Sequence, residues 1–352
     1  MSEESSTPFS KQRVLVLGAT GYIGGEILFK LLKLPEFHNF EISTITRSSE
    51  SASELSKLTQ NRVNTIVGSL DDSSLLEEHL SNSDVVINAA DVDNVNVGKS
   101  IAKIASKVEH PFLILHTSGT SVLGDEISAT KGPSDKVYSD LKDNKEITNL
   151  PETQPHRPVD KIILSIQDSN PKWVKTVLIS PPTIFGLNEG YIHRESVQIP
   201  LLIELSIKNK QAFTTYSGDY KWSHVHIDDL ADLYIILLRN LLINGGKDIK
   251  TGKEGYYFAE VGVHYWKDIS SRIARLLKEH KVLDNDSVAQ LEPKDIRKLA
   301  DGFEFAPLLW GTNAVSKAEL GREYGWEPKF TTADLLHDIE ASVDRAVERL
   351  GN

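Results

Sequence analysis

The segment "VLVLGATGYIGGEIL", residues 14–28, constrains the fold of this chain more than any other stretch. It places Gly18, Gly21 and Gly24 between an apolar run and an amphipathic one, which is the order strand, turn, helix. In a dinucleotide-binding unit the first glycine permits the tight turn, the second lets a pyrophosphate approach the backbone, and the third lets the helix pack on the strand. The free N–H groups of the helix start then hold the phosphate charge. We therefore predict a cofactor loop here, with a βα turn that binds nothing as the alternative.

Apolar runs rich in β-branched residues recur along the first half of the chain. They span residues 13–19, 40–46, 64–69, 84–90, 111–118 and 175–182, and helical patterns separate the first few. Alternating strands and helices predict an α/β fold, a Rossmann-type doubly wound parallel sheet with helices on both faces. A helix is expected from about Thr332 onward.

The same pattern predicts the domain organisation. We expect a disordered N-terminal tail (1–12), a dinucleotide-binding core (13–186) with a polar insertion at about 125–155, and a smaller C-terminal substrate lobe (187–352) interleaved with the core.

Composition restricts the partners. The net charge of −11 argues against nucleic acid and anionic membranes, which are polyanionic. The absence of cysteine excludes disulfides and thiolate chemistry and fits a reducing compartment, so a cytoplasmic location is expected. The longest apolar stretches fall short of the roughly 20 residues that a membrane-spanning helix needs. A small-molecule substrate is the expected partner.

The segment "TITRSSE" bears on which nucleotide binds. A site that prefers NAD usually offers an acidic residue about 20 residues past the glycine loop, where it contacts the ribose. This chain has Arg47 there, followed by Ser48 and Ser49. A guanidinium suits a 2′-phosphate, so NADP(H) is favoured over NAD(H). The alternative is a solvated surface arginine.

Several motifs together resemble the extended short-chain dehydrogenase/reductase family, which includes sugar-nucleotide epimerases and dehydratases. The resemblance runs nearly end to end and rests on "GATGYIGG", "VVINAA", "ISPPTIFG", "WSHVHIDDLADLY" and "LGREYGWEPKFT". Within it, "HTSGTSVLG", "HRPVDKIIL" and "ESVQIP" look most like uncharacterised fungal NAD(P)-binding members.

The resemblance implies where the catalytic residues should lie. The family uses a tyrosine as acid/base, a lysine four residues later, and a serine or threonine after the fifth strand. Matching the acid that follows the lysine to Asp160 puts His156 in the lysine place and Glu152 in the tyrosine place. The usual serine falls on Gly119, flanked by Ser118 and Thr120, so those two hydroxyls are expected to serve.

Two other arrangements are open at this point. Tyr138 and Lys142 have the Tyr-x-x-x-Lys spacing but lie in the polar insertion. His224, His226 and Asp228 could hold a metal by strand alternation, although we expect the histidines to pack against the other lobe, with Asp228 or Asp229 capping the next helix. No metal is expected.

The resemblance also implies a wider set of contacts. Cofactor contacts are expected, besides the three glycines and Arg47, at Thr20, Tyr22, Ile23, Leu70, Ala89, Ala90, Thr117, His156, Pro182, Thr183 and Ile184. Substrate contacts are expected at Tyr191 and Arg194, and a homodimer is common for this architecture.

Three functions are compatible with these residues. The first is an NADP(H)-dependent oxidoreductase on a small carbonyl or alcohol, in which Glu152 and His156 replace tyrosine and lysine as the acid/base pair. The second is a catalytically inactive NADP(H)-binding sensor or regulatory protein. The third is a sugar-nucleotide epimerase or dehydratase, which would lack its proton-transferring tyrosine.

Overall fold

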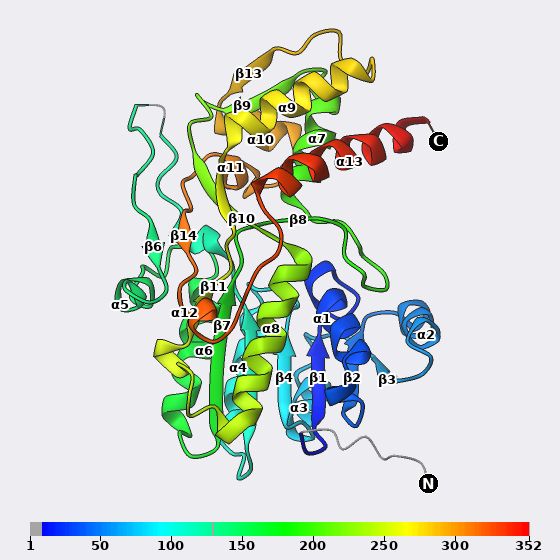
Figure 1. The fold of residues 1–352 in the computed structure, drawn as a ribbon, viewed down its shortest axis with the longest axis vertical. Helices are drawn as coiled ribbons and strands as arrows, with labels where there is room; N and C mark the ends of the chain where they lie inside the picture. The colour runs from blue at the N-terminus through cyan, green and yellow to red at the C-terminus, as the bar shows by residue number, and fades with distance from the viewer. Residues whose placement is uncertain (1–8, 129, 352) are drawn as a thin grey trace.

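The computed structural model describes residues 9–128 and 130–351, and its largest element is a seven-stranded sheet (Figure 1). Its strands run parallel in the order β11-β7-β5-β4-β1-β2-β3. They span Arg13–Leu17 (β1), Glu41–Thr46 (β2), Val63–Val67 (β3), Val85–Asn88 (β4), Phe112–Thr117 (β5), Val174–Ser180 (β7) and Tyr256–Phe258 (β11). The doubly wound α/β fold and the strands predicted from the apolar runs are confirmed. Residues 1–8 of the predicted tail lie outside the described residues.

Helices cover both faces of this sheet. On one face α1 (Tyr22–Lys33) packs against α8 (Ile227–Leu242), and on the other α4 (Val95–Ala105) contacts both α3 (Ser73–Ser81) and α6 (Arg157–Ser169). Strand alternation produces the two faces: Val14 and Val16 belong to the core of α1 and α8, whereas Leu15 and Leu17 belong to the core of α3, α4 and α6. Helix α2 (Ser49–Leu58) packs on β3.

A second lobe lies above the carboxyl ends of these strands in Figure 1. Two small sheets form part of it, with orders β12-β10-β8 and β13-β9. Its elements are β8 (Thr183–Phe185), α7 (Gln198–Lys208), β9 (Ala212–Thr215), β10 (Lys221–His226), β12 (Gly262–Tyr265), α9 (Trp266–Glu279), β13 (Val288–Leu291), α10 (Pro293–Leu299), α11 (Ala306–Trp310) and α13 (Thr332–Gly351). The predicted C-terminal helix is confirmed as α13. The C-terminal half of the chain also contributes α8 and β11 to the dinucleotide-binding core, so the two parts are interleaved.

The polar insertion carries secondary structure of its own. Strand β6 (Tyr138–Ser139) pairs in parallel with β14 (Ser316–Lys317), and α5 (Asn144–Ile147) follows it. Buried Asp140 accepts hydrogen bonds from the N–H groups of Phe258, Glu319 and Leu320. The insertion is therefore tied to β11 and to α12 (Leu320–Glu323).

Short 3₁₀ turns complete the chain. They span Pro35–Phe37, Thr120–Leu123 (η2), Ile243–Gly245 and Gly252–Glu254. Across the part of the chain that the structure describes, no helix combines the length and the apolar character that crossing a bilayer requires.

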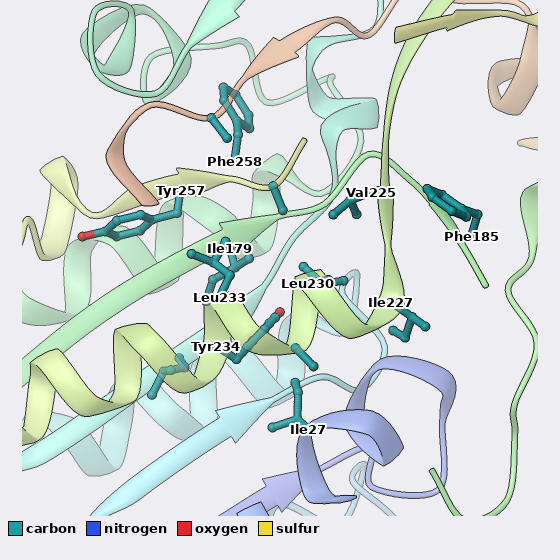
Figure 2. Close-up of a cluster of buried hydrophobic side chains, with 14 of the residues drawn as sticks. Ile27, Ile179, Phe185, Val225, Ile227, Leu230, Leu233, Tyr234, Tyr257 and Phe258 are labelled. Carbon is teal, nitrogen blue, oxygen red and sulfur yellow. The ribbon is translucent and has the colours of Figure 1, made fainter. Parts of the chain in front are cut away.

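Helix α8 is apolar around most of its circumference because it is enclosed by the sheet, by α1 and by the second lobe. Leu230 and Leu233 are fully buried, together with Ile179 of β7 and Ile27 of α1 (Figure 2). Burying an aliphatic side chain of this size stabilises the fold by about 1.5–3 kcal/mol relative to exposure. The packing of α8 therefore fixes how the second lobe sits on the core.

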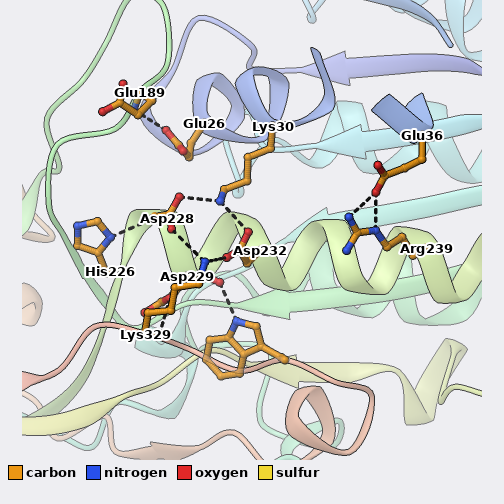
Figure 3. Close-up of polar contacts among 11 residues, drawn as sticks. Glu26, Lys30, Glu36, Glu189, His226, Asp228, Asp229, Asp232, Arg239 and Lys329 are labelled. Carbon is orange, nitrogen blue, oxygen red and sulfur yellow. Dashed lines mark hydrogen bonds and ion pairs between the residues drawn. The ribbon is translucent and has the colours of Figure 1, made fainter. Parts of the chain in front are cut away.

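Polar contacts anchor both sides of α8 (Figure 3). Lys30 of α1 donates to Asp228 and Asp232, at 2.6 Å each. Buried Asp229 accepts from the N–H groups of Lys329 and Phe330 at 2.8 and 3.0 Å. The three aspartates lie close enough together to hold a cation, and the Lys30 ammonium already bridges two of them.

The predicted aspartate cap of α8 is wrong. His226 is the N-cap, and its Nδ1 accepts a hydrogen bond from the N–H of Asp228. His226 also stacks on Phe330, and His224 lies 3.2 Å from His264 between their Nδ1 atoms. Burial lowers the pKa of His224 to about 4, so at neutral pH it is uncharged. These histidines pack between elements of the second lobe.

We expect Asp229→Ala to lower the free energy of unfolding by about 2–3 kcal/mol, because it removes a buried carboxylate that accepts two part-buried backbone hydrogen bonds, from Lys329 and Phe330. Asp232→Ala is the matched control: its carboxylate is partly exposed and makes ion pairs only, so the loss should be about 1 kcal/mol or less. Chemical denaturation of both variants measures the difference. Equal losses would contradict the assigned role of Asp229.

Candidate active site

The glycine loop connects β1 to α1 through two close backbone contacts. Gly18 has a φ of +84°, and a Cβ there would lie 2.4 Å from the carbonyl oxygen of Ala89. A Cβ on Gly24 would lie 2.3 Å from the carbonyl oxygen of Gly18. No side chain fits at either position, since real Cβ contacts are longer than this. The loop can therefore bring the start of α1 directly over the ends of β1 and β4.

Helix α1 begins without a side-chain cap. Gly21 is its N-cap residue, and the first turn contains no acidic residue. The partial positive charge of the helix start is therefore not neutralised locally, as an anion-binding site requires. Ile23 follows in this first turn and is half-buried.

A loop from the second lobe, residues 186–194, lies against the glycine loop. The His193 N–H donates to the Thr20 carbonyl at 3.2 Å, and the Asn188 side chain donates to the Tyr22 carbonyl at 2.6 Å. The Tyr22 hydroxyl in turn donates to the Gly186 carbonyl at 2.6 Å. Thr20 and Tyr22, two of the predicted cofactor contacts, therefore also bind this loop by hydrogen bonds. The Tyr22 side chain points toward the loop.

The predicted substrate contacts lie in the same loop. The Arg194 guanidinium donates to the carbonyl of Asn188 at 2.8 Å, so it closes the loop on itself. The Tyr191 ring lies 6.2 Å from that of Phe29 on α1, and burial raises the pKa of Tyr191. Both residues shape the loop, and their contact with a substrate stays a prediction.

The other predicted cofactor contacts follow the carboxyl ends of the strands. Arg47 is exposed directly after β2 and makes no hydrogen bond or ion pair within the described residues, while Ser48 caps α2. Leu70 follows β3, and Ala89 and Ala90 follow β4. Pro182, Thr183 and Ile184, which follow β7, are buried or half-buried. These positions lie along one edge of the sheet.

His156 lies at the start of α6 with both ring nitrogens engaged. Its Nδ1 lies 2.9 Å from Oδ1 of Asp93, in the loop after β4, and its Nε2 lies 2.6 Å from Oγ of Ser121, in η2 after β5. The side chain is only 16% exposed, whereas that of Asp93 is 56% exposed. The hydrogen bond from His156 lowers the pKa of Asp93, which favours its ionised form. Neither Asp93 nor Ser121 was predicted from the sequence.

The structure does not bring the side chains of Glu152 and His156 together. Helix α6 begins at Arg157, so Glu152 precedes it, and the two residues are not one helical turn apart. The Glu152 side chain is exposed and makes an ion pair with Lys161. That hydrogen bond lowers the pKa of Glu152, opposite to what a general acid near neutral pH needs.

The hydroxyls predicted to assist catalysis point into the core. Ser118 Oγ donates to Oδ2 of Asp160 at 3.1 Å, and both residues are buried. Burial raises the pKa of Asp160 to about 6, partly offset by this hydrogen bond. Thr120 is likewise buried, and Thr117 Oγ1 lies 2.6 Å from the Tyr234 hydroxyl on α8. Ser121, rather than Ser118 or Thr120, is the hydroxyl that meets His156.

Gly119 makes room for the histidine ring. A Cβ on Gly119 would lie 3.0 Å from Nε2 of His156 and 3.3 Å from its Cδ2. A serine in this position, as the resemblance leads one to expect, would crowd the imidazole. The absence of a side chain at Gly119 therefore allows the His156 ring to reach the Ser121 hydroxyl.

The side chains of Tyr138 and Lys142 have different neighbours and do not form a pair. Lys136, and not Lys142, lies over the Tyr138 ring at 4.9 Å, and Lys142 lies 3.8 Å from Glu319. Tyr138 belongs to β6 in the insertion.

Comparisons with known proteins support this fold. The NmrA-like family model matches residues 10–112. Oxidase ucsJ of an Acremonium species is 28% identical over 97% of this chain and 99% of its own length. Phenylcoumaran benzylic ether reductase PT1 of Pinus taeda is 35% identical over 103 residues, which are 28% of this chain and 33% of that protein.

Solved structures share the fold over almost the whole chain. The PbgP3 protein of Burkholderia pseudomallei superposes with a TM-score of 0.65 and 16% identity, covering 97% of this chain and 98% of that one. A dTDP-glucose 4,6-dehydratase of Bacillus anthracis, in complex with NAD, gives 0.61 and 16%, covering 94% and 95%. These superpositions show that the chain shares the fold of these proteins. The NmrA-like match lies over the segment that carries the glycine loop.

We expect Gly119→Ala to push the His156 ring away and break its hydrogen bond to Ser121, because the added methyl would sit about 3 Å from Nε2. Long-range proton–nitrogen spectra of the histidine rings report this as a shift of the His156 signals, with those of His224 unchanged. Gly132→Ala is the control, since nothing lies within 4 Å of its added Cβ. Unchanged His156 signals would show that Gly119 does not hold the ring in place.

Proposed function

We propose that this protein is an NADP(H)-dependent oxidoreductase acting on a small carbonyl or alcohol, with His156 as its acid/base. The observation that carries the proposal is the His156 side chain, held between a carboxylate and a hydroxyl at the sheet edge where the cofactor loop lies. Imidazole is the side chain most often used to donate and accept protons in enzymes.

The residues around the glycine loop fit a nicotinamide nucleotide. The start of α1 has no cap and no acidic neighbour, and Gly18 and Gly24 allow backbone contacts that no other residue could make. Solved relatives of the same fold were crystallised with NAD. When bound, the nucleotide supplies or accepts a hydride. Gly18, Gly21 and the first turn of α1 would hold its phosphates.

Arg47 supports a preference for NADP(H). Its guanidinium is exposed at the end of β2 and has no protein partner within the described residues, so it is available to a 2′-phosphate. Arginine binds phosphate through paired, charge-assisted hydrogen bonds.

The contacts of His156 define its part in the reaction. In the reductive direction Nε2 gives its proton to the carbonyl oxygen, directly or through the Ser121 hydroxyl that lies 2.6 Å away. Asp93 accepts a hydrogen bond from the Nδ1–H group of His156, and its negative charge stabilises the positive imidazolium. Because Asp93 is exposed, the histidine can recover its proton from solvent.

A cofactor-binding sensor without turnover is the second candidate. It is favoured by the position of Glu152, which occupies the tyrosine place of the aligned family and points into solvent. An epimerase is less well supported, because it needs a tyrosine in that place. Turnover of a carbonyl substrate by NADPH separates the first candidate from the other two.

We expect Arg47→Glu to raise the Kd for NADPH at least tenfold, about 1.4 kcal/mol, and to leave the Kd for NADH nearly unchanged. Titration followed by tryptophan fluorescence measures both values. Lys107→Glu is the control: it reverses the same charge between α4 and β5, at the opposite edge of the sheet, and should change neither Kd. If Arg47→Glu weakens NADH equally, Arg47 does not recognise the 2′-phosphate.

We expect His156→Ala to lower NADPH-dependent carbonyl reduction 10²- to 10⁴-fold, the usual contribution of an acid/base group, while NADPH binding persists. Glu152→Ala should leave the rate within about twofold, since its carboxylate lies in solvent. The assay is NADPH consumption with a panel of small aldehydes and ketones. A larger loss in Glu152→Ala than in His156→Ala would reverse the assignment.

A further inference from the structure

The hydrogen bonds around His156 run in one chain from hydroxyl to imidazole to carboxylate. Ser121 Oγ lies 2.6 Å from Nε2, and Nδ1 lies 2.9 Å from Oδ1 of Asp93. This is the order in which a serine nucleophile is activated in hydrolases on unrelated folds, recognised by geometry rather than by sequence position. We propose that Ser121 is a nucleophile that takes an acyl group from a small ester, with His156 and Asp93 as its base and the support of that base.

The proton positions follow from the partners. A carboxylate can only accept, so Nδ1 of His156 carries the proton that it donates to Asp93. In the neutral ring Nε2 is then unprotonated and accepts the proton of the Ser121 hydroxyl. Asp93 stays ionised because the hydrogen bond from His156 lowers its pKa. This is the tautomer that a general base requires.

The backbone holds the histidine in place. His156 has a φ of +67°, a left-handed conformation that costs energy for any residue with a Cβ. Its carbonyl accepts the N–H groups of Val159 and Asp160 at the start of α6, and Gly119 leaves space for the ring. Strain of this kind persists only where the surrounding structure holds the residue in place.

Two nearby serines show the difference between a structural hydroxyl and a reactive one. Ser118 donates a hydrogen bond to Asp160 and is buried, so a reagent cannot reach its hydroxyl. Ser121 is partly exposed and meets a base. The N–H of Gly119, the residue beside the ring, forms no hydrogen bond within the described residues and is a candidate donor to the oxyanion.

The reaction balances with water as its only co-reactant. Ser121 Oγ attacks the ester carbonyl carbon while its proton moves to Nε2 of His156. The bond from that carbon to the alcohol oxygen breaks, and the alcohol leaves with the proton from His156. Water then attacks the acyl carbon, gives a proton to His156, and the bond to Oγ breaks as Ser121 recovers its proton. The products are the acid and the alcohol, with no change of oxidation state.

The first test uses the full chain without nucleotide. We expect a fluorophosphonate probe to label the peptide that contains Ser121, and p-nitrophenyl acetate to be hydrolysed. Ser121→Ala should abolish the label, and His156→Ala should slow hydrolysis at least tenfold. Ser165→Ala, on the exposed face of α6, should change neither. Labelling elsewhere, or hydrolysis unchanged in Ser121→Ala, would overturn the proposal.

A second variant tests the base without depending on turnover. The chain contains no cysteine, so Ser121→Cys introduces a single thiol. Beside the imidazole it should react with iodoacetamide at pH 6.5 at least tenfold faster than the thiol of Ser165→Cys, because a neighbouring base favours the thiolate. Adding His156→Ala should remove the advantage. Equal rates in the two single variants would show that His156 does not activate position 121.

Labelling and hydrolysis need no nucleotide, so they test the Ser121 nucleophile independently of the proposed oxidoreductase. A labelled Ser121 in a protein that binds neither NADPH nor NADH would overturn the oxidoreductase alone. An unreactive Ser121 in a protein that reduces carbonyls would overturn the nucleophile alone.

Discussion

The close contact between the glycine loop and the end of β4 determines the arrangement of this protein's site. A Cβ on Gly18 would overlap the Ala89 carbonyl, and one on Gly24 would overlap the Gly18 carbonyl. Only with glycine at both positions can the start of α1 lie over the carboxyl ends of β1 and β4. Asp93 lies in the loop between β4 and α4, so the loop that carries the carboxylate partner of His156 starts at this contact. The lobe loop at 186–194 then fastens onto Thr20 and Tyr22 and completes this edge.

The positions that the resemblance predicts to be catalytic differ from the family pattern in a coordinated way. A histidine stands in the lysine place, and it fits because Gly119 has no side chain. The hydroxyl lost at 119 is present two residues later at Ser121, on the far side of the short η2 turn. Ser118 could not take this role because its hydroxyl is bonded to buried Asp160.

The fold could be predicted from the sequence because its signals are local. Each of the predicted core strands is an apolar run, and the strand–glycine–helix order lies within fifteen consecutive residues. The position of His156 followed from the acid and the apolar run of α6. The aligned spacing put Glu152 in the tyrosine place, but spacing alone does not show whether a residue lies on the helix, and α6 begins only at Arg157. Asp93 and Ser121 were missed because they meet His156 across 63 and 35 residues, and no spacing marks such contacts.

A crystal structure of the protein with NADPH tests the central claim most directly, which is that one edge of the sheet holds both the nucleotide and the His156 acid/base. The account predicts phosphates at the start of α1, the 2′-phosphate beside Arg47, and the nicotinamide C4 facing the side chains of His156 and Ser121. A nucleotide bound elsewhere, or a nicotinamide ring directed away from His156, would contradict it.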